Sequence, residues 1–271
     1  MTELWQKTAR EMVDLLAKGE IRPKEAIDAA AERIAATNGA VNAMVTLCLE
    51  RAYAAAARIE TEGHPEQPGP GYLYGLPVSI KDLHHVEGVL CTQGSPIYAD
   101  HISVESDLEV RTLEANGAIV IGKSNTPEFG AGANTFNEVF GATRNPWDTR
   151  MNAGGSSGGA AVNLATGQTW LATGSDLGGS LRIPGSFNSI VGCRPSPGRC
   201  PRGTSASLNL FDDMSVVGPM ARNVGDVALM LDAMVGQYAR DPISLPVPNV
   251  PFQAAAQAAT PPKRIGWSAS M

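Results

Sequence analysis

Two serines in glycine-rich loops are the residues of this sequence best suited to do chemistry. Ser156 lies in Asn-Ala-Gly-Gly-Ser-Ser-Gly-Gly (152–159), and Ser180 lies in Gly-Ser-Asp-Leu-Gly-Gly-Ser-Leu-Arg-Ile-Pro (174–184). Glycine lets the backbone approach a reacting group, although inside an element it costs about 0.5–1 kcal/mol relative to alanine. Two such loops so close together predict a site, and Lys81 in Gly-Leu-Pro-Val-Ser-Ile-Lys-Asp completes the pattern.

In these contexts, Lys81, Ser156 and Ser180 resemble the amidase signature family of serine hydrolases. The similarity runs from the first expected helix to about Gly236 and rests on long motifs. A serine hydroxyl is a poor nucleophile without a base that takes its proton. The resemblance implies a relay in which Ser180 attacks a carbonyl, Ser156 passes the proton and Lys81 receives it, with no cofactor and no metal.

The relay requires an uncharged Lys81. Free lysine titrates near pH 10.4, and lowering its pKa to near neutrality costs about 4 kcal/mol, which burial can supply. Residues 76–80 are apolar and predict a buried strand that delivers Lys81 at its end. The ordinary alternative is a solvated lysine, or one paired with Asp82.

The resemblance also implies an oxyanion hole at the second loop. Its donors would be the backbone N–H groups of Leu177, Gly178, Gly179 and Ser180. One such donor contributes about 2.7–4 kcal/mol to transition-state stabilisation.

Other residues of the two loops are expected to support this chemistry. Ser157 would support Ser156 by hydrogen bonding, and in the family a cis peptide bond precedes the serine that aligns with Ser156. Asp176 and Arg182 flank the second loop and are expected to pair, although they could be unrelated surface charges.

The sequence departs from the family pattern at several positions near the site. Cys193-Arg194 stands where a small apolar residue and lysine are commoner, Gly185 replaces an alanine, and Asn152-Ala153 precedes the first loop. None of these changes removes a catalytic side chain.

The remaining chain predicts an α/β domain with a layered mixed sheet flanked by helices. Residues 1–62 predict three helices: one after a capping box of Thr8 and Glu11, one from Pro23, and one over 47–60. Further helices are expected over 105–116, 157–166 and 222–235, the last amphipathic. Short strands are expected over 118–121 and 169–172.

We expect one amidase signature domain over 1–271, with N-terminal helices in 1–62, a catalytic core in 72–236 and a Pro- and Ala-rich connector in 237–262. Members of the family are usually much longer. Lys263-Arg-Ile-Gly-Trp resembles the start of a further strand, so we expect the chain to be truncated on its C-terminal side.

Composition excludes several function classes. The net charge of −6 argues against a nucleic-acid partner, which requires clustered Lys and Arg. No apolar run approaches the roughly 20 residues of a membrane span, and the N-terminus has no apolar signal core. Cys48, Cys91, Cys193 and Cys200 lack Cys-x-x-Cys spacing, which favours reduced thiols in a cytoplasm.

Two further motifs suggest rival functions. Gly117 to Ser124 matches the phosphate-loop pattern, but its four central residues are Ala-Ile-Val-Ile, a strand rather than a loop, which disfavours nucleotide binding. His84 and His85 could belong to a Ser-His-Asp triad or, with Asp82 and Cys91, to a metal site. We favour loop histidines at the rim of the pocket.

The sequence thus predicts an amidase that hydrolyses a small-molecule amide through an acyl-enzyme on Ser180. A component of a glutamine-dependent amidotransferase is a subclass alternative. A second alternative is an inactive remnant or a binding and assembly module. A homo-oligomer, or association with a missing C-terminal half, is left open.

Overall fold

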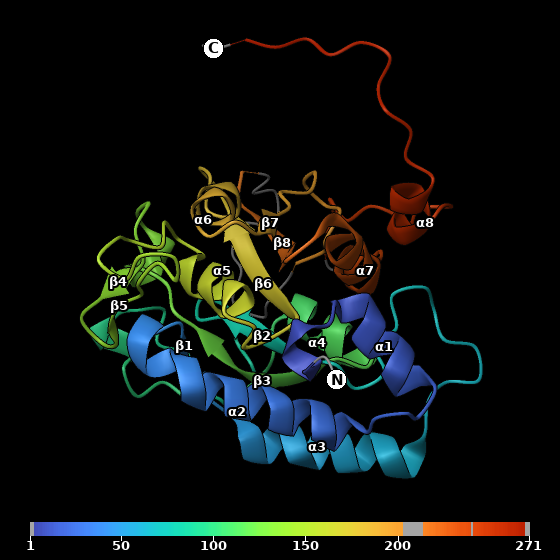
Figure 1. Cartoon of the computed structure of the whole chain (residues 1–271), viewed down its shortest axis with the longest axis horizontal. Coiled ribbons are helices and arrows are strands. Elements are labelled where there is room, and N and C mark those ends of the chain that lie inside the picture. Colours follow the sequence, from blue (N-terminus) through green and yellow to red (C-terminus); the bar gives the residue numbers. More distant parts are fainter. Residues whose placement is uncertain (1–2, 203–213, 240, 269–271) are drawn as a thin grey trace.

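Six strands of the described chain form one mixed sheet that carries the predicted site residues (Figure 1). The structure, a computed structural model, describes residues 3–202, 214–239 and 241–268. In spatial order the strands are β1 (Met44–Leu47), β3 (Ile119–Ser124), β2 (Pro77–Lys81), β6 (Leu171–Asp176), β8 (Val216–Ala221) and β7 (Val191–Gly192). Strand β2 runs parallel to both β3 and β6, whereas the outer pairs are antiparallel. A separate hairpin pairs β4 (Phe136–Asn137) with β5 (Gly141–Ala142).

Helices cover both faces of this sheet. They are α1 (Ala9–Ala17), α2 (Pro23–Val41), α3 (Leu49–Glu62), α4 (Leu108–Ala115), α5 (Gly158–Ala165), α6 (Arg182–Phe187), α7 (Val224–Met234) and α8 (Phe252–Gln257). Three 3-10 turns lie at Leu4–Gln6, Pro96–Tyr98 and Glu128–Gly130. Figure 1 shows α2 and α3 side by side along one edge, with α5 and α7 packed on the sheet.

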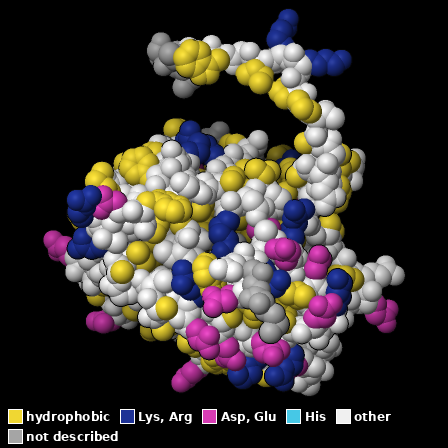
Figure 2. Space-filling model, viewed as in Figure 1, with side chains coloured by type: hydrophobic (Ala, Val, Ile, Leu, Met, Phe, Trp, Pro, Cys, Tyr) yellow, Lys and Arg dark blue, Asp and Glu magenta, His cyan; other side chains and the backbone are white. Residues whose placement is uncertain are grey.

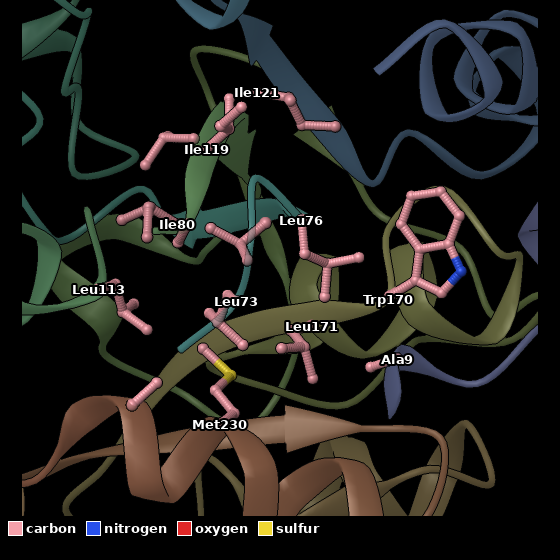
Figure 3. Packing of buried hydrophobic residues seen from close by; sticks show 14 of the residues in the cluster. Ala9, Leu73, Leu76, Ile80, Leu113, Ile119, Ile121, Trp170, Leu171 and Met230 are labelled. Atoms are coloured by element: carbon pink, nitrogen blue, oxygen red, sulfur yellow. The ribbon is translucent and has the colours of Figure 1, made fainter. Parts of the chain in front are cut away.

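The alternation of side chains in β2 separates the core from the site. Val78 and Ile80 belong to the main hydrophobic cluster, together with Leu171 of β6 and Met230 of α7 (Figure 3). Successive strand residues point to opposite faces, so Ser79 and Lys81 face the other side. There the Ser79 hydroxyl accepts a hydrogen bond from the Asn163 side chain of α5 at 2.8 Å. Lys81 therefore points toward the N-terminal end of α5.

The predicted fold class is confirmed, and several predicted elements have the expected positions. Thr8 caps α1 in a capping box with Glu11, and Pro23 begins α2. The prediction of helix throughout 1–62 is wrong, because residues 44–47 form β1. This short segment pairs with the buried strand β3, and that tertiary contact outweighs the helical preference of its neighbours.

Other predictions need correction. Helix α7 is not amphipathic: residues 226–234 are all buried, because the sheet, α1, α4 and α8 surround it. The connector contains α8, whose first N–H groups are bound by the buried Asp232 carboxylate. The segment Lys263 to Trp267 is exposed and forms no strand, because no strand of the described chain pairs with it. None of the described helices is long and apolar enough to cross a membrane.

The N-terminus of α1 is held by a carboxylate that lies 217 residues further along the chain. The fully buried Asp226 accepts hydrogen bonds from the backbone N–H groups of Ala9 at 2.9 Å and Arg10 at 3.1 Å. The first N–H groups of a helix have no partner within the helix, so an external acceptor stabilises them. This contact fastens α1 to α7.

We predict that Asp226→Ala lowers the free energy of unfolding by roughly 1–3 kcal/mol, because two helix N–H groups lose their acceptor. Chemical denaturation measures this value. Asp14→Ala, an exposed substitution in the same helix α1, should stay within about 0.5 kcal/mol of the parent. Equal stability of the two variants would show that Asp226 does not support α1.

Candidate active site

The amine of Lys81 lies among three serine hydroxyls in the interior of the protein. Its Nζ is 2.7 Å from Ser156 Oγ, 2.9 Å from Ser157 Oγ and 3.1 Å from Ser175 Oγ. The Lys81 side chain is fully buried. The structure therefore brings together Lys81 and the Ser156 loop, which are 75 residues apart in the chain.

The parallel pairing of β2 and β6 produces this convergence. Parallel strands place their C-terminal ends at the same edge of a sheet, so Lys81 meets the last residues of β6. The backbone N–H of Lys81 donates to Thr173 Oγ1 at 3.0 Å. Neither Thr173 nor Ser175 was among the predicted site residues, because the expected strand ended at Ala172.

Burial sets the charge state of Lys81. Desolvation lowers the pKa of Lys81 to about 7, and the Asp176 carboxylate acts in the opposite direction. Asp82, the neighbour considered as its partner, instead accepts a hydrogen bond from Lys123 Nζ at 3.0 Å. A substantial fraction of Lys81 is therefore uncharged at neutral pH.

The Ser156 loop is packed tightly against neighbouring backbone. The peptide bond between Gly155 and Ser156 is cis. A side chain at Gly155 would meet the backbone nitrogen of Asn134 at 2.8 Å, so glycine is required there for close approach. The N–H of Ser157 donates to the carbonyl oxygen of Ser180 at 3.2 Å, which joins the two serine loops.

The Ser180 loop projects from the end of β6. Ser180 is partly buried, and its hydroxyl makes no hydrogen bond within the described part of the chain. Of the four predicted oxyanion donors, the Gly179 N–H is already donated to Asp176 Oδ1 at 2.8 Å. The N–H groups of Leu177, Gly178 and Ser180 bond to no described residue.

Asp176 organises this loop. Its buried carboxylate accepts hydrogen bonds from the backbone N–H of Leu181 at 3.1 Å and from two guanidinium nitrogens of Arg182 at 3.0 Å each. The expected pair of Asp176 and Arg182 is thus present. Burial acts to raise the pKa of Asp176, but hydrogen bonds from Arg182, Gly179 and Leu181 outweigh it and hold the pKa at about 2.

The two rival motifs lie outside this arrangement. Lys123, the lysine of the phosphate-loop pattern, belongs to β3, and its amine is fully buried against Asp82. The expectation that both histidines lie at a pocket rim is wrong for His84. This residue is buried, and its Nδ1 pairs with the buried Glu109 carboxylate, which makes the burial of both groups possible. His85 contacts Ser103 at 2.9 Å.

A group that could hold a metal ion surrounds His84. Ligand atoms of His84, Asp107 and Glu109 lie within 4.8 Å of one another, and all three residues are buried. The atoms that face one another are already used in hydrogen bonds: His84 Nδ1 bonds to Glu109, and Asp107 accepts from the His85 N–H at 2.9 Å. The facing atoms therefore form a hydrogen-bonded cluster, whereas His84 Nε2 is buried with no hydrogen-bond partner in the described part of the chain.

Comparison with known proteins places the fold and these motifs in one family. The model of the family described as Amidase matches residues 25–271. The chain belongs to the amidase signature family. It is 41% identical to a glutamyl-tRNA(Gln) amidotransferase subunit of Moorella thermoacetica over 251 residues, which are 91% of this chain and 50% of the relative.

Further members of the amidase signature family show the same partial coverage. The chain is 36% identical to an acylamidase of Rhodococcus erythropolis over 97% of this chain and 55% of that relative. A solved bacterial aryl acylamidase matches with a TM-score of 0.84 and 33% identity, over 92% of this chain and 51% of that one. The chain thus spans about half the length of the curated relatives it matches.

We predict that Lys123→Met lowers the free energy of unfolding by about 3–5 kcal/mol, because it leaves the Asp82 carboxylate buried without its cation. Denaturant titration measures the loss. Lys18→Met, at an exposed position, serves as the control and should have little effect. If Lys123→Met left stability unchanged but abolished a measurable ATP affinity, the phosphate-loop interpretation would be restored.

Proposed function

We propose that this chain carries the catalytic serines and base of an amide hydrolase. Ser180 attacks the amide carbonyl and forms an acyl-enzyme, ammonia or an amine leaves, and water then releases the carboxylic acid. The observation that carries the proposal is the 2.7 Å contact between the buried Lys81 amine and the Ser156 hydroxyl. The Lys81 amine has a pKa of about 7, and a general base is most effective when its pKa lies near the pH of the reaction.

Hydrogen-bond counting supports the direction of proton transfer. A neutral amine has two N–H donors and one lone pair, whereas three hydroxyls surround Nζ. The Ser157 hydroxyl can donate to the carbonyl oxygen of Ser175 at 3.3 Å, so it accepts from Lys81. If Ser175 also accepts, the lone pair receives the proton of Ser156. Ser156 Oγ is then free to accept the proton of Ser180.

The backbone of the second loop suits a developing negative charge. The N–H groups of Leu177, Gly178 and Ser180 lack protein acceptors in the described structure, whereas the Gly179 N–H is held by Asp176. We propose that the three unbonded donors bind the oxyanion and that Gly179 fixes the shape of the loop. Gly179 has a φ of +123°, which other residues rarely adopt.

The relatives suggest two substrate classes. One is named as part of a glutamyl-tRNA(Gln) amidotransferase and another as an acylamidase, and each covers most of this chain. Ammonia release from glutamine would favour the first class. Amine release from simple acyl amides would favour the second.

A second proposal is that the chain works as one part of an assembly. Leu177 in the Ser180 loop is 62% exposed, and Phe187 at the end of the following helix α6 is 48% exposed. Figure 2 shows apolar side chains more frequent in the upper part of the viewed face, with charged side chains concentrated lower down. Because the relatives are about twice as long, a further segment, a second polypeptide or a second copy of this chain would complete the site.

We predict that Ser180→Ala, Ser156→Ala and Lys81→Ala each lower kcat on a cleaved amide by on the order of 10³-fold or more. Ser186→Ala, an exposed serine in α6, is the matched control and should retain activity. Activity of the parent should rise with pH through a midpoint near 7, because only the uncharged Lys81 accepts a proton. Full activity of any of the three variants would remove its assigned role.

Labelling with a serine-directed fluorophosphonate separates the two proposals. A covalent adduct on Ser180 of the isolated chain supports a competent nucleophile. Folded protein that forms no adduct alone, but forms one with an added partner polypeptide, supports the assembly. Folded protein that remains unlabelled in every case contradicts the hydrolase proposal.

A further inference from the structure

We propose that Arg194 is a positioning residue that holds Asp176 and, through Asp176, the loop that carries Ser180. The inference rests on the proposed roles of Ser180 and Lys81. Arg194 is one of the departures from the family pattern, and the sequence alone assigns it no role.

Arg194 lies just after β7, the edge strand beside β8, and reaches across to the end of β6. The preceding residue, Cys193, donates its backbone N–H to the carbonyl oxygen of Pro219 in β8 at 3.1 Å. Strand β8 in turn pairs with β6, with Val216 opposite Asp176. The backbone of Arg194 is therefore anchored to the sheet close to the residue it binds.

The guanidinium of Arg194 joins two segments. Its Nη1 donates to the backbone oxygen of Asp176 and to Asp176 Oδ1, the latter at 3.2 Å, and its Nη2 donates to the carbonyl oxygen of Met214 at 2.9 Å. A planar guanidinium can serve several acceptors at once, whereas an ammonium acts as a point charge. Arginine therefore suits this position better than lysine.

Asp176 connects Arg194 to the Ser180 loop and to Lys81. Its carboxylate binds the N–H groups of Gly179 and Leu181, which flank Ser180. It is also the charge that acts on Lys81, where it favours the ammonium form. Within the described residues, the charged side chains that contact Asp176 are Arg182 and Arg194.

The two arginines are not equivalent. The side chain of Arg182 is 57% exposed, so solvent and salt weaken its effect, whereas that of Arg194 is 26% exposed. Arg194 also binds the Asp176 backbone, which Arg182 does not. Loss of Arg194 should therefore loosen the loop and leave more negative charge facing Lys81.

The test compares Arg194→Met with Arg194→Lys and with the control Arg199→Met. Arg199 follows on the same segment, is bound to the Pro246 carbonyl at an exposed site, and does not contact Asp176. For each variant we would measure the rate of fluorophosphonate labelling at Ser180 against pH. The titration midpoint of the Lys81 amine would be followed by NMR with isotope-labelled lysine.

We expect Ser180 in the Arg194→Met variant to be labelled at least about 10-fold more slowly than in the parent. The midpoint of the labelling rate against pH and the NMR titration midpoint of Lys81 should both rise by about 0.5–1 pH unit. Arg194→Lys should keep the midpoints close to those of the parent while labelling more slowly, and Arg199→Met should match the parent. If Arg194→Met does not fold, Arg194→Lys still tests the proposal through its labelling rate. A parent that is not labelled would contradict the proposed function, whereas an unchanged Lys81 midpoint and labelling rate in both Arg194 variants would overturn the role of Arg194.

Discussion

The burial of one lysine amine without a carboxylate partner is the constraint on which the rest of this site depends. Asp82 follows Lys81 in the chain and Asp176 ends the neighbouring strand β6, but each of these carboxylates is bound elsewhere. Asp82 bonds to Lys123 and to the backbone and hydroxyl of Thr92. Asp176 bonds to two arginines and two backbone N–H groups. Lys81 is left with three hydroxyls, and the cost of burying a charge then favours the neutral amine.

The geometry of the sheet determines which groups the buried Lys81 side chain contacts. The alternation in β2 sends Val78 and Ile80 into the main core and Ser79 and Lys81 toward α5. The same strand end meets the end of β6, so Lys81, the serine loops and Asp176 converge at one edge of the sheet. The apolar face of β2 therefore fixes the position of the polar groups on its other face.

Much of this arrangement could be predicted from local sequence. An apolar run that ends at Lys81 specifies a buried strand, and the two glycine-rich serine loops mark the positions where backbone must approach closely. Thr173 and Ser175 were missed because Thr-Gly-Ser-Asp has a weak preference for strand. Antiparallel pairing of these four residues with β8 outweighs that preference.

Other features depend on contacts between distant segments, which local patterns do not specify. The burial of residues 226–234 in α7 and the binding of α1 by Asp226 arise from packing between segments that are far apart in the sequence. The pairing of Asp82 with Lys123, rather than with its sequence neighbour Lys81, also depends on a contact between distant segments. Asp82 follows Lys81 in sequence, but β3 places Lys123 within 3.0 Å of its carboxylate.

The most direct measurement of the central claim is the titration of the Lys81 amine itself. Selective ¹³C labelling of lysine side chains, with Lys81→Met used to assign the signal, would follow its chemical shift against pH in the folded protein. The buried, unpaired amine predicts a midpoint near pH 7. A midpoint close to 10.4, the value of free lysine, would show that Lys81 is charged at neutral pH and cannot act as the base.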